Sequence, residues 1–400
     1  MHLAALSLTD FRTYAQLDLT LEPGVTVFVG ANGLGKTNIV EAVGYLATLG
    51  SHRVSQDGPL IRFGAEQALV RARLVRRTQQ LSLEMEINAR GGNRVRINRA
   101  NPVRAREALG LCRTVLFAPE DLELVKGDPG SRRRFLDELT ATLFPAQATL
   151  RGEYDRVLRQ RNALLKSARA AGRFTENHRA TLQVWDEHLA ATGAQLLQAR
   201  VTLLERLAPH LSAAYRRLTD GSKELSARYR STVVGHGTDD DDVTGAGAGS
   251  VGPVDAGSDL AGLDTETIRR AFLEALESGQ TRDRDRALTL TGPHRDDVEL
   301  VLGQAPAKGY ASHGESWSVA LSLRLAAYEL LREDALTDGG EPILILDDVF
   351  AELDADRRTR LAAIAADAEQ VLITAAVVED IPASLIDRQL RVGAGVVEAA

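Results

Sequence analysis

Hydrophobic positions near the start of the chain predict two strands followed by a helix. Residues 17–21 alternate leucine with polar side chains, which is typical of a strand with one buried face. Residues 25–29 form the apolar run VTVFV, which is typical of a fully buried strand. Apolar side chains at helical spacing then predict a helix over 38–49. A short glycine-rich segment therefore connects a buried strand to a helix.

The rest of the chain divides into regions of different patterning. From about 68 to 98 the alternation returns, and its interruption by Gly91-Gly92-Asn93 predicts a hairpin. Residues 130–232 have few glycines and long charged segments at helical spacing, which predict a helical lobe. The segment 235–262 holds eight glycines and the acidic run 239–242, so we expect a disordered insertion. After residue 288 the pattern again predicts ordered strands and helices.

The composition is typical of a globular protein in a reducing compartment. The chain has 400 residues, more than one compact core normally holds, and 44% of them are hydrophobic. The single cysteine, Cys112, excludes an intramolecular disulfide. Neither a signal peptide nor a membrane-spanning run is recognisable, so we expect a cytoplasmic protein with no membrane partner. Aromatic residues make up 4% of the chain, which disfavours nucleic-acid binding by base stacking.

The distribution of charge is more informative than its sum. A net charge of −7 argues mildly against a nucleic-acid partner, because phosphates attract clustered positive charge. Residues 71–106, however, contain ten arginines and only two acidic residues, Glu84 and Glu86. Within this cluster, the candidate phosphate contacts are Arg94, Arg96 and Arg99.

The strongest functional signal follows the buried strand. Residues 30–37 are GANGLGKT and fit the P-loop pattern between a predicted strand and a predicted helix. Glycines let backbone N–H groups face phosphate oxygens, and the helix dipole favours the same anion. Lys36 would bind the β- and γ-phosphates, and the Thr37 hydroxyl would bind Mg²⁺. The predicted ATP-binding residues are Gly30, Ala31, Asn32, Gly33, Leu34, Gly35, Lys36 and Thr37.

A second motif supplies the carboxylates that such a site needs. Residues 342–350 are PILILDDVF, an apolar strand that ends in two aspartates, as in the Walker B motif. Asp347 is the expected Mg²⁺ ligand, usually through water, and Asp348 is placed to orient or deprotonate the attacking water. The catalytic candidates are therefore Lys36 and Asp348, and the metal candidates are Thr37 and Asp347. The expected cofactors are ATP and Mg²⁺.

Three further segments indicate the class of ATPase. Residues 312–316, SHGES, precede a helix predicted over 317–332 and stand just before Walker B, where ABC ATPases have their signature motif. Residues 351–354, AELD, resemble the D-loop, with Asp354 as its acidic residue. Residues 370–374 predict a strand that ends in Thr374, where many ABC proteins have histidine. This order and spacing indicate an ABC ATPase.

The predicted fold class is α/β, an ABC-type P-loop ATPase head with an inserted, mainly helical lobe. The head is expected to combine residues 1–125 with residues 285–400. The lobe is expected to occupy residues 126–284, including the disordered Gly/Asp-rich insertion at 235–262. No internal repeat is visible in the sequence.

The sequence resembles the RecF family, the repair branch of the SMC-like ABC ATPases, over nearly its whole length apart from 235–262. Several of the motifs that carry this resemblance lie outside the nucleotide site. The motifs are TDFR at 9–12, GANGLGKT at 30–37, SHR at 51–53, GSRRRFLD at 130–137, GPHRDD at 292–297 and LDDVFAELD at 346–354.

The resemblance implies a cytoplasmic protein that forms a homodimer on binding ATP. It implies binding to single-stranded and double-stranded DNA at gaps or single-strand/duplex junctions. It also implies work with the mediators RecO and RecR to load RecA, in recombination, replication and the SOS response. Ser312 and Gly314 would contact the γ-phosphate held by the other protomer. Arg132 and Arg133 are candidate DNA contacts, with a solvated helix start or an ion-pair cluster as the alternative.

Departures from the usual ABC pattern leave alternatives open. Glu315 replaces the usual glutamine of the signature, and Asp348 replaces the glutamate of most ABC proteins, which suits slow hydrolysis. A different SMC-like head would need hundreds of heptad residues between the Walker motifs. A transporter ATPase would need that glutamine and a histidine in place of Thr374. A non-hydrolysing ATP sensor is the third alternative. His52 and Arg53 lie either near the nucleotide or in a structural turn.

Overall fold

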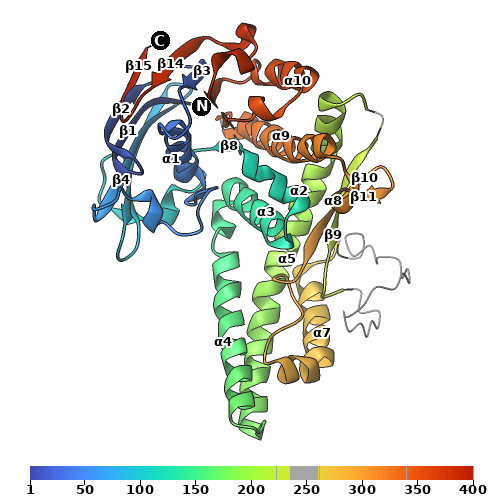
Figure 1. The fold of residues 1–400 in the computed structure, drawn as a ribbon. Coiled ribbons are helices and arrows are strands. Elements are labelled where there is room, and N and C mark those ends of the chain that lie inside the picture. Colours follow the sequence, from blue (N-terminus) through green and yellow to red (C-terminus); the bar gives the residue numbers. More distant parts are fainter. Residues whose placement is uncertain (222, 235–259, 261, 339, 400) are drawn as a thin grey trace.

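The structure is a computed structural model that describes residues 1–221, 223–234, 260, 262–338 and 340–399. The predicted disordered insertion at 235–262 lies outside the described residues, apart from Leu260 and Gly262. Two six-stranded sheets and a layer of long helices make up most of the described chain (Figure 1).

The sheet that carries the phosphate loop is parallel except for one edge strand. Its order is β15-β14-β3-β13-β12-β8, so β13 lies between β3 and the Walker B strand β12. The inner strands are buried on both faces, which confirms the fully buried strand predicted at 25–29. The strands are β3 (Gly24–Val29), β8 (Thr114–Phe117), β12 (Ile343–Asp347), β13 (Gln370–Ala375), β14 (Arg388–Val392) and β15 (Val397–Ala399).

A second, antiparallel sheet covers the helix that follows the phosphate loop. Helix α1 (Lys36–Thr48) lies between the two sheets, and residues 38–47 are all buried because it has no solvent-facing side. The hairpin predicted around 91–93 is confirmed by the antiparallel pairing of β5 with β6. In the order β2-β1-β4-β5-β6-β7, the strands are β2 (Tyr14–Thr20), β1 (His2–Phe11), β4 (Gln67–Arg76), β5 (Gln79–Asn88), β6 (Arg94–Ile97) and β7 (Val103–Arg104).

Long helices cover the other face of the parallel sheet. α9 (His313–Asp338) packs between the sheet and α5 (Glu176–Leu218), and α4 (Leu150–Ala170) and α7 (Thr265–Arg286) flank α5 (Figure 1). Among the described residues, no helix is both long and apolar enough to span a membrane. The remaining helices are α2 (Glu123–Lys126), α3 (Pro129–Leu143), α8 (Ala307–Tyr310) and α10 (Ala355–Ala365).

The helical pattern predicted over 130–232 does not continue to its end. Residues after α5 form β9 (Leu225–Arg230), which pairs with β10 (Asp297–Leu302) in a small sheet of order β11-β10-β9, with β11 at Ala305–Pro306. Leu225 and Tyr229 are buried while Ser226 and Arg228 are exposed, so the alternation of a strand is present in the sequence. This strand is too short to stand out beside the long helices.

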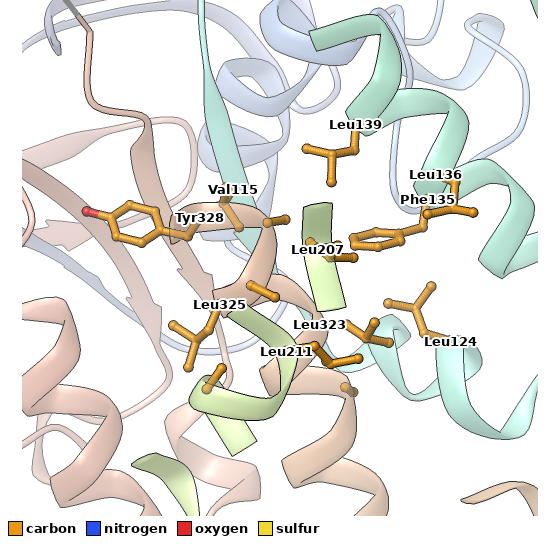
Figure 2. Packing of buried hydrophobic residues seen from close by; sticks show 14 of the residues in the cluster. Val115, Leu124, Phe135, Leu136, Leu139, Leu207, Leu211, Leu323, Leu325 and Tyr328 are labelled. Atoms are coloured by element: carbon orange, nitrogen blue, oxygen red, sulfur yellow. The ribbon is translucent and has the colours of Figure 1, made fainter. Parts of the chain in front are cut away.

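The helices and the parallel sheet share one hydrophobic core. Figure 2 shows Leu207 and Leu211 of α5 beside Leu323 of α9 and Phe135 of α3, with Val115 of β8 at the edge of the same cluster. Burying a leucine or phenylalanine side chain contributes about 1.5–3 kcal/mol relative to leaving it exposed. The helical layer is therefore packed directly against the sheet.

Two fully buried arginines fix how the outer helices dock. Arg161 of α4 donates to Asp186 of α5 and to Asp283 of α7, each at 2.6 Å. Arg200 of α5 donates to both carboxylate oxygens of Asp137 in α3, at 2.7 and 2.8 Å. Removing one partner of such a pair leaves the other charge buried and uncompensated, so these contacts fix one arrangement of the helices.

Gly193→Ala in α5 is expected to destabilise the protein, because a Cβ at this position would lie 2.4 Å from Cε1 of Phe272 in α7. The overpacking should lower the free energy of unfolding by about 1–3 kcal/mol. Gly152→Ala in α4 is the matched control, since its Cβ would meet nothing within 4 Å and alanine favours a helix by up to about 1 kcal/mol. Urea and thermal unfolding measure both effects. Equal stability of the Gly193→Ala and unsubstituted proteins would contradict the packing of α5 on α7.

Candidate functional site

The phosphate loop leaves β3 at Gly30 and enters α1 at Lys36. Gly33 and Gly35 have φ angles of +84° and +105°, which side-chain-bearing residues rarely adopt. At Gly30 a Cβ would lie 2.4 Å from the carbonyl oxygen of Val392, so backbone packs directly on backbone. The Tyr14 hydroxyl donates to the Gly35 carbonyl oxygen at 3.2 Å. The strands on both sides therefore hold the loop in shape.

Lys36 lies inside the loop. The residue is only 4% exposed, and its Nζ donates to the carbonyl oxygen of Gly30 at 2.7 Å. The carbonyl oxygen of Ala31 and the side-chain oxygen of Asn32 each lie 3.3 Å from the same nitrogen. The loop thus holds the Lys36 ammonium against its own oxygen atoms, inside a glycine-rich segment of the kind that binds phosphate.

The Asp347 carboxylate lies where β12, β13 and the start of α1 meet. Its Oδ1 accepts from the Thr37 hydroxyl at 3.1 Å and from the Thr374 hydroxyl at 2.5 Å. Because β3, β13 and β12 are adjacent and parallel, the residues at their carboxyl ends come together. Hydroxyl and carboxylate oxygens are ligands that Mg²⁺ prefers, so Thr37 and Asp347 fit this ion. From the sequence, Thr374 was only a replaced histidine, and its role in positioning Asp347 was missed.

Asp348 has a different environment from its neighbour. Its φ of +51° is strained for a non-glycine residue, and its N–H donates to the Thr374 hydroxyl at 3.0 Å. Burial raises the pKa of its carboxyl group, and the nearby Lys36 ammonium opposes that shift. Asp348 lines the same cavity as Lys36 and Thr37. A carboxylate of raised pKa beside the phosphate loop is suited to accept a proton.

A buried carboxylate joins two of the sequence motifs behind the loop. Glu41 of α1 is 1% exposed and accepts from Arg12 at 2.5 and 2.8 Å and from the Ser51 hydroxyl at 2.5 Å. Arg53 lies 3.5 Å from the same carboxylate and lines the cavity over the loop. The motifs at 9–12 and 51–53 therefore meet at α1 and brace the phosphate loop.

His52 lies beside the Walker B carboxylates. Its Nε2 is 3.6 Å from Oδ2 of Asp347 and is buried with no hydrogen-bond partner among the described residues. Of the two alternatives left open by the sequence, a position near the nucleotide site is the one that this geometry supports.

A cavity of about 730 Å³ opens over the phosphate loop. Its lining includes the cations Lys36, Arg53 and Arg62 and the fully exposed ring of Phe63. The turn that carries this ring is anchored, because Arg62 pairs with Asp10 at 2.6 Å. Cationic side chains and an exposed aromatic ring in one cavity fit the phosphates and the base of a nucleotide.

The signature segment begins α9 and lies outside this cavity, which neither Ser312 nor Gly314 lines. Ser312 and Glu315 form a capping box: the Glu315 N–H donates to the Ser312 hydroxyl at 3.2 Å, and the Glu315 carboxylate accepts from the Ser312 N–H at 2.8 Å. Lys223 donates to Glu315 at 2.5 Å, and this bond together with the cap lowers the pKa of Glu315 to about 2. Glu315, which replaces the usual glutamine, therefore stabilises the signature turn through its contacts with Ser312 and Lys223.

Asp354 of the D-loop is connected to the signature helix through Arg357, a residue that the sequence did not single out. Asp354 caps α10 by accepting from the Arg357 N–H at 2.9 Å and also pairs with its guanidinium. Arg357 Nε donates to the Ser318 hydroxyl in α9 at 2.8 Å. A Cβ on Gly314 would lie 3.1 Å from the same guanidinium, so the glycine permits this close approach.

The arginine cluster on the antiparallel sheet is partly neutralised. Glu84 of β5 lies opposite Arg71 of β4 and Arg96 of β6, and it forms ion pairs with both, the second at 3.3 Å. Arg94 and Arg99 are exposed. The positive charge that this sheet can offer to a partner is therefore smaller than its number of arginines suggests.

Arg132 and Arg133 pack α3 against β10. Arg132 is 5% exposed and donates through Nε and Nη2 to the two carboxylate oxygens of Asp297, at 2.7 and 2.9 Å. Arg133 Nη1 donates to the carbonyl oxygen of Asp296 at 2.5 Å, and burial lowers the pKa of its guanidinium. The contacts of Arg132 fit the ion-pair alternative that the sequence left open, while Arg133 is half-buried and uses Nη1 on the protein backbone.

Comparison with known proteins identifies relatives along the whole chain. The model of the RecF/RecN/SMC N terminal domain family matches residues 2–392. The chain is 63% identical over 403 residues to the DNA replication and repair protein RecF of Renibacterium salmoninarum, with 100% of both chains covered. It is 61% identical over 396 residues to RecF of an Arthrobacter species, with 99% of this chain and 98% of that relative covered.

Solved structures agree with this likeness. The structure of the recombination mediator protein RecF-ATP in the RecFOR pathway has a TM-score of 0.83 at 26% identity, covering 100% of this chain and 97% of that chain. An Smc head domain from Pyrococcus furiosus has a TM-score of 0.52 at 16% identity, covering 100% and 96%, and shows the shared fold alone. The predicted α/β fold of an ABC-type ATPase head is confirmed. With these matches spanning its full length, the chain belongs to the RecF family of DNA replication and repair proteins.

Proposed function

We propose that this chain is an ATP-dependent DNA-binding protein of recombinational repair. The observation that carries the proposal is a divided site: Lys36 and Asp348 line one cavity, whereas Ser312 and Gly314 lie outside it. Such a site is complete when two copies face each other and each supplies the half that the other lacks. ATP then holds the dimer closed, and the closed dimer binds DNA.

Within one protomer, residues 30–37 bind the phosphates through their backbone N–H groups and through Lys36. Thr37 and Asp347 are the Mg²⁺ ligands, and the 3.1 Å between their oxygen atoms supports this pairing. A bound Mg²⁺ would neutralise part of the charge on the β- and γ-phosphates. Phe63, which lines the same cavity, receives the base.

Hydrolysis in this proposal is slow and serves to reopen the dimer. Asp348 orients the attacking water or accepts its proton, and its raised pKa favours the second role. Lys36 stabilises the charge that develops on the transferred phosphoryl group. Ser312 and Gly314 of one copy contact the γ-phosphate held by the other, and Asp354 lies at the same interface. Weak stimulation by DNA follows if DNA favours the closed dimer.

The partners follow from family membership. The relatives are named DNA replication and repair proteins, and the similar solved structure is described within the RecFOR pathway. We therefore infer binding to gapped or single-strand/duplex junction DNA, together with mediators of the RecO and RecR type that load RecA. Arg94 and Arg99 are exposed and stay candidate DNA contacts, while Arg96 shares its charge with Glu84.

Lys36→Met should remove most of the affinity for ATP while the protein folds normally. Hydrogen bonds to charged groups contribute roughly 1.5–3 kcal/mol each, so the Kd for ATP should rise at least about tenfold. Nucleotide titration together with a melting curve measures both properties, and Lys166→Met, at an exposed lysine of α4, is the control. Undiminished ATP binding by the Lys36→Met protein would exclude the phosphate-loop assignment.

Ser312→Arg should leave ATP binding intact and block ATP-dependent dimerisation, because a bulky cation would fill the space meant for the γ-phosphate. Ser278→Arg, the same exchange at an exposed position of α7, is the control and should dimerise normally. Sedimentation with and without ATP distinguishes the two variants. A Ser312→Arg protein that dimerises with ATP contradicts the divided site.

Asp348→Asn should have the opposite effect from Ser312→Arg. The side chain keeps its shape and loses the proton acceptor, so ATP-bound dimers should form and persist, with single-turnover hydrolysis reduced at least about 100-fold. DNA should also dissociate more slowly from this variant than from the unsubstituted protein. Equal and measurable hydrolysis by both proteins would reject Asp348 as the catalytic residue, whereas no hydrolysis by either would identify a sensor that binds ATP without consuming it.

A further inference from the structure

Beyond its first two turns, α4 carries positive charge without any further acidic residue; its two carboxylates, Glu153 and Asp155, lie near its start. Residues 156–175 contain six basic residues and no aspartate or glutamate. One of the six, Arg161, is buried in its pairs with Asp186 and Asp283. The other five are exposed and form what we call the α4 stripe: Arg156, Arg159, Lys166, Arg169 and, just beyond the helix end, Arg173.

The α4 stripe faces away from the protein. The buried residues of α4 include Tyr154, Arg161 and Leu165, which recur at the helical period and face α5 and α7. Arg156, Arg159 and Lys166 lie on the opposite side of the helix, whereas Arg169 follows Leu165 by four residues and borders the buried side. Among the described residues, no helix lies beside the side of α4 that is turned away from α5 (Figure 1).

The charges of the α4 stripe are not used within the protein. In the part of the chain that the structure describes, none of the five side chains forms an ion pair. Arginines elsewhere are commonly paired: Arg151 at the start of the same helix binds Asp137 and Asp155, each at 2.8 Å. A row of exposed cations that form no ion pairs attracts an extended anion.

We propose that the α4 stripe binds the sugar-phosphate backbone of duplex DNA. This inference rests on the proposed DNA-binding function and names a contact surface for it. At about 1.5 Å per residue, Arg156 to Arg169 span roughly 20 Å, about six base pairs of duplex. Single-stranded DNA fits less well, because binding of unpaired bases uses aromatic platforms and the nearby Phe174 is covered by Arg284, 4.1 Å from its ring centre.

Binding along the α4 stripe is independent of base sequence and depends on salt. Lysine and arginine at helical spacing neutralise phosphates, and removing one such charge lowers the slope of log K against log salt by about 0.9 on duplex DNA. The triple variant R156Q/R159Q/K166Q keeps good helix formers and removes three charges, so its slope should fall by up to about 2.7. Its affinity for duplex in low salt should fall at least about tenfold.

The matched control removes the same charge from another exposed helix face. R270Q/R282Q/R286Q changes three exposed arginines of α7, where Glu274, Glu277 and Asp285 are interspersed. Duplex and single-stranded DNA are titrated with the full chain and ATP over a range of salt, beside ATP affinity and melting temperature. We expect the α7 variant to retain the slope of the unsubstituted protein, and both variants to retain ATP affinity and melting temperature. R159Q alone, with an expected slope change of about 0.9, serves if the triple variant folds poorly.

The outcomes separate this inference from the function on which it rests. Failure of the unsubstituted protein to bind any DNA with ATP would reject the proposed function itself. Normal binding with equal slopes for the α4 and α7 variants would overturn the α4 contact and leave the proposed function standing. A weakening confined to single-stranded DNA would also overturn it, because the inferred occupant is a duplex.

Discussion

The parallel order β3-β13-β12 is the constraint on which the nucleotide site depends. Phe28, Leu372 and Ile345 face α1, while their neighbours in each strand face the helical layer, so both faces of the three strands are buried. A shift of register by one residue would turn every side chain to the wrong face. The hydrophobic core therefore fixes where the strands end, and the strand ends bring Thr374 and Asp347 together.

The same packing connects the signature half of the site to the outer helices. Lys223, in the segment after α5, binds Glu315 at the start of α9, and Arg217 of α5 binds Glu329 further along α9 at 2.9 Å. Arg161 in turn locks α4 to α5. If two copies close on ATP as proposed, α4 moves with the signature of its own copy. DNA held along α4 would then be sensitive to the nucleotide state without any flexible connection.

The parts of the site that depend on local pattern could be predicted from the sequence. Their residue types are compatible with only a few backbone conformations. This holds for the phosphate loop, the Walker B strand and the hairpin at 91–93, and the structure has all three where they were expected. Contacts between distant residues were not predictable in this way. The role of Thr374 depends on which strand lies between β3 and β12, and the burial of Arg132 depends on β10, 165 residues away. A count of arginines likewise could not show that Glu84 lies among them.

The pairing of β3 with β13 also has a consequence for biosynthesis. Residues 24–29 emerge from the ribosome early, but their neighbours in the sheet are residues 370–375 on one side and 388–391 on the other. An isolated parallel strand has no hydrogen-bond partners of its own. Pairing between such distant segments is slow, and the apolar side chains of the first strand stay exposed until the other strands are available. The antiparallel sheet of β1, β2 and β4–β7 has no such delay, since all its strands lie within residues 2–104. A nascent chain can therefore complete that sheet while its nucleotide site does not yet exist, and ATP cannot act as a folding template until residues 370–391 have been synthesised.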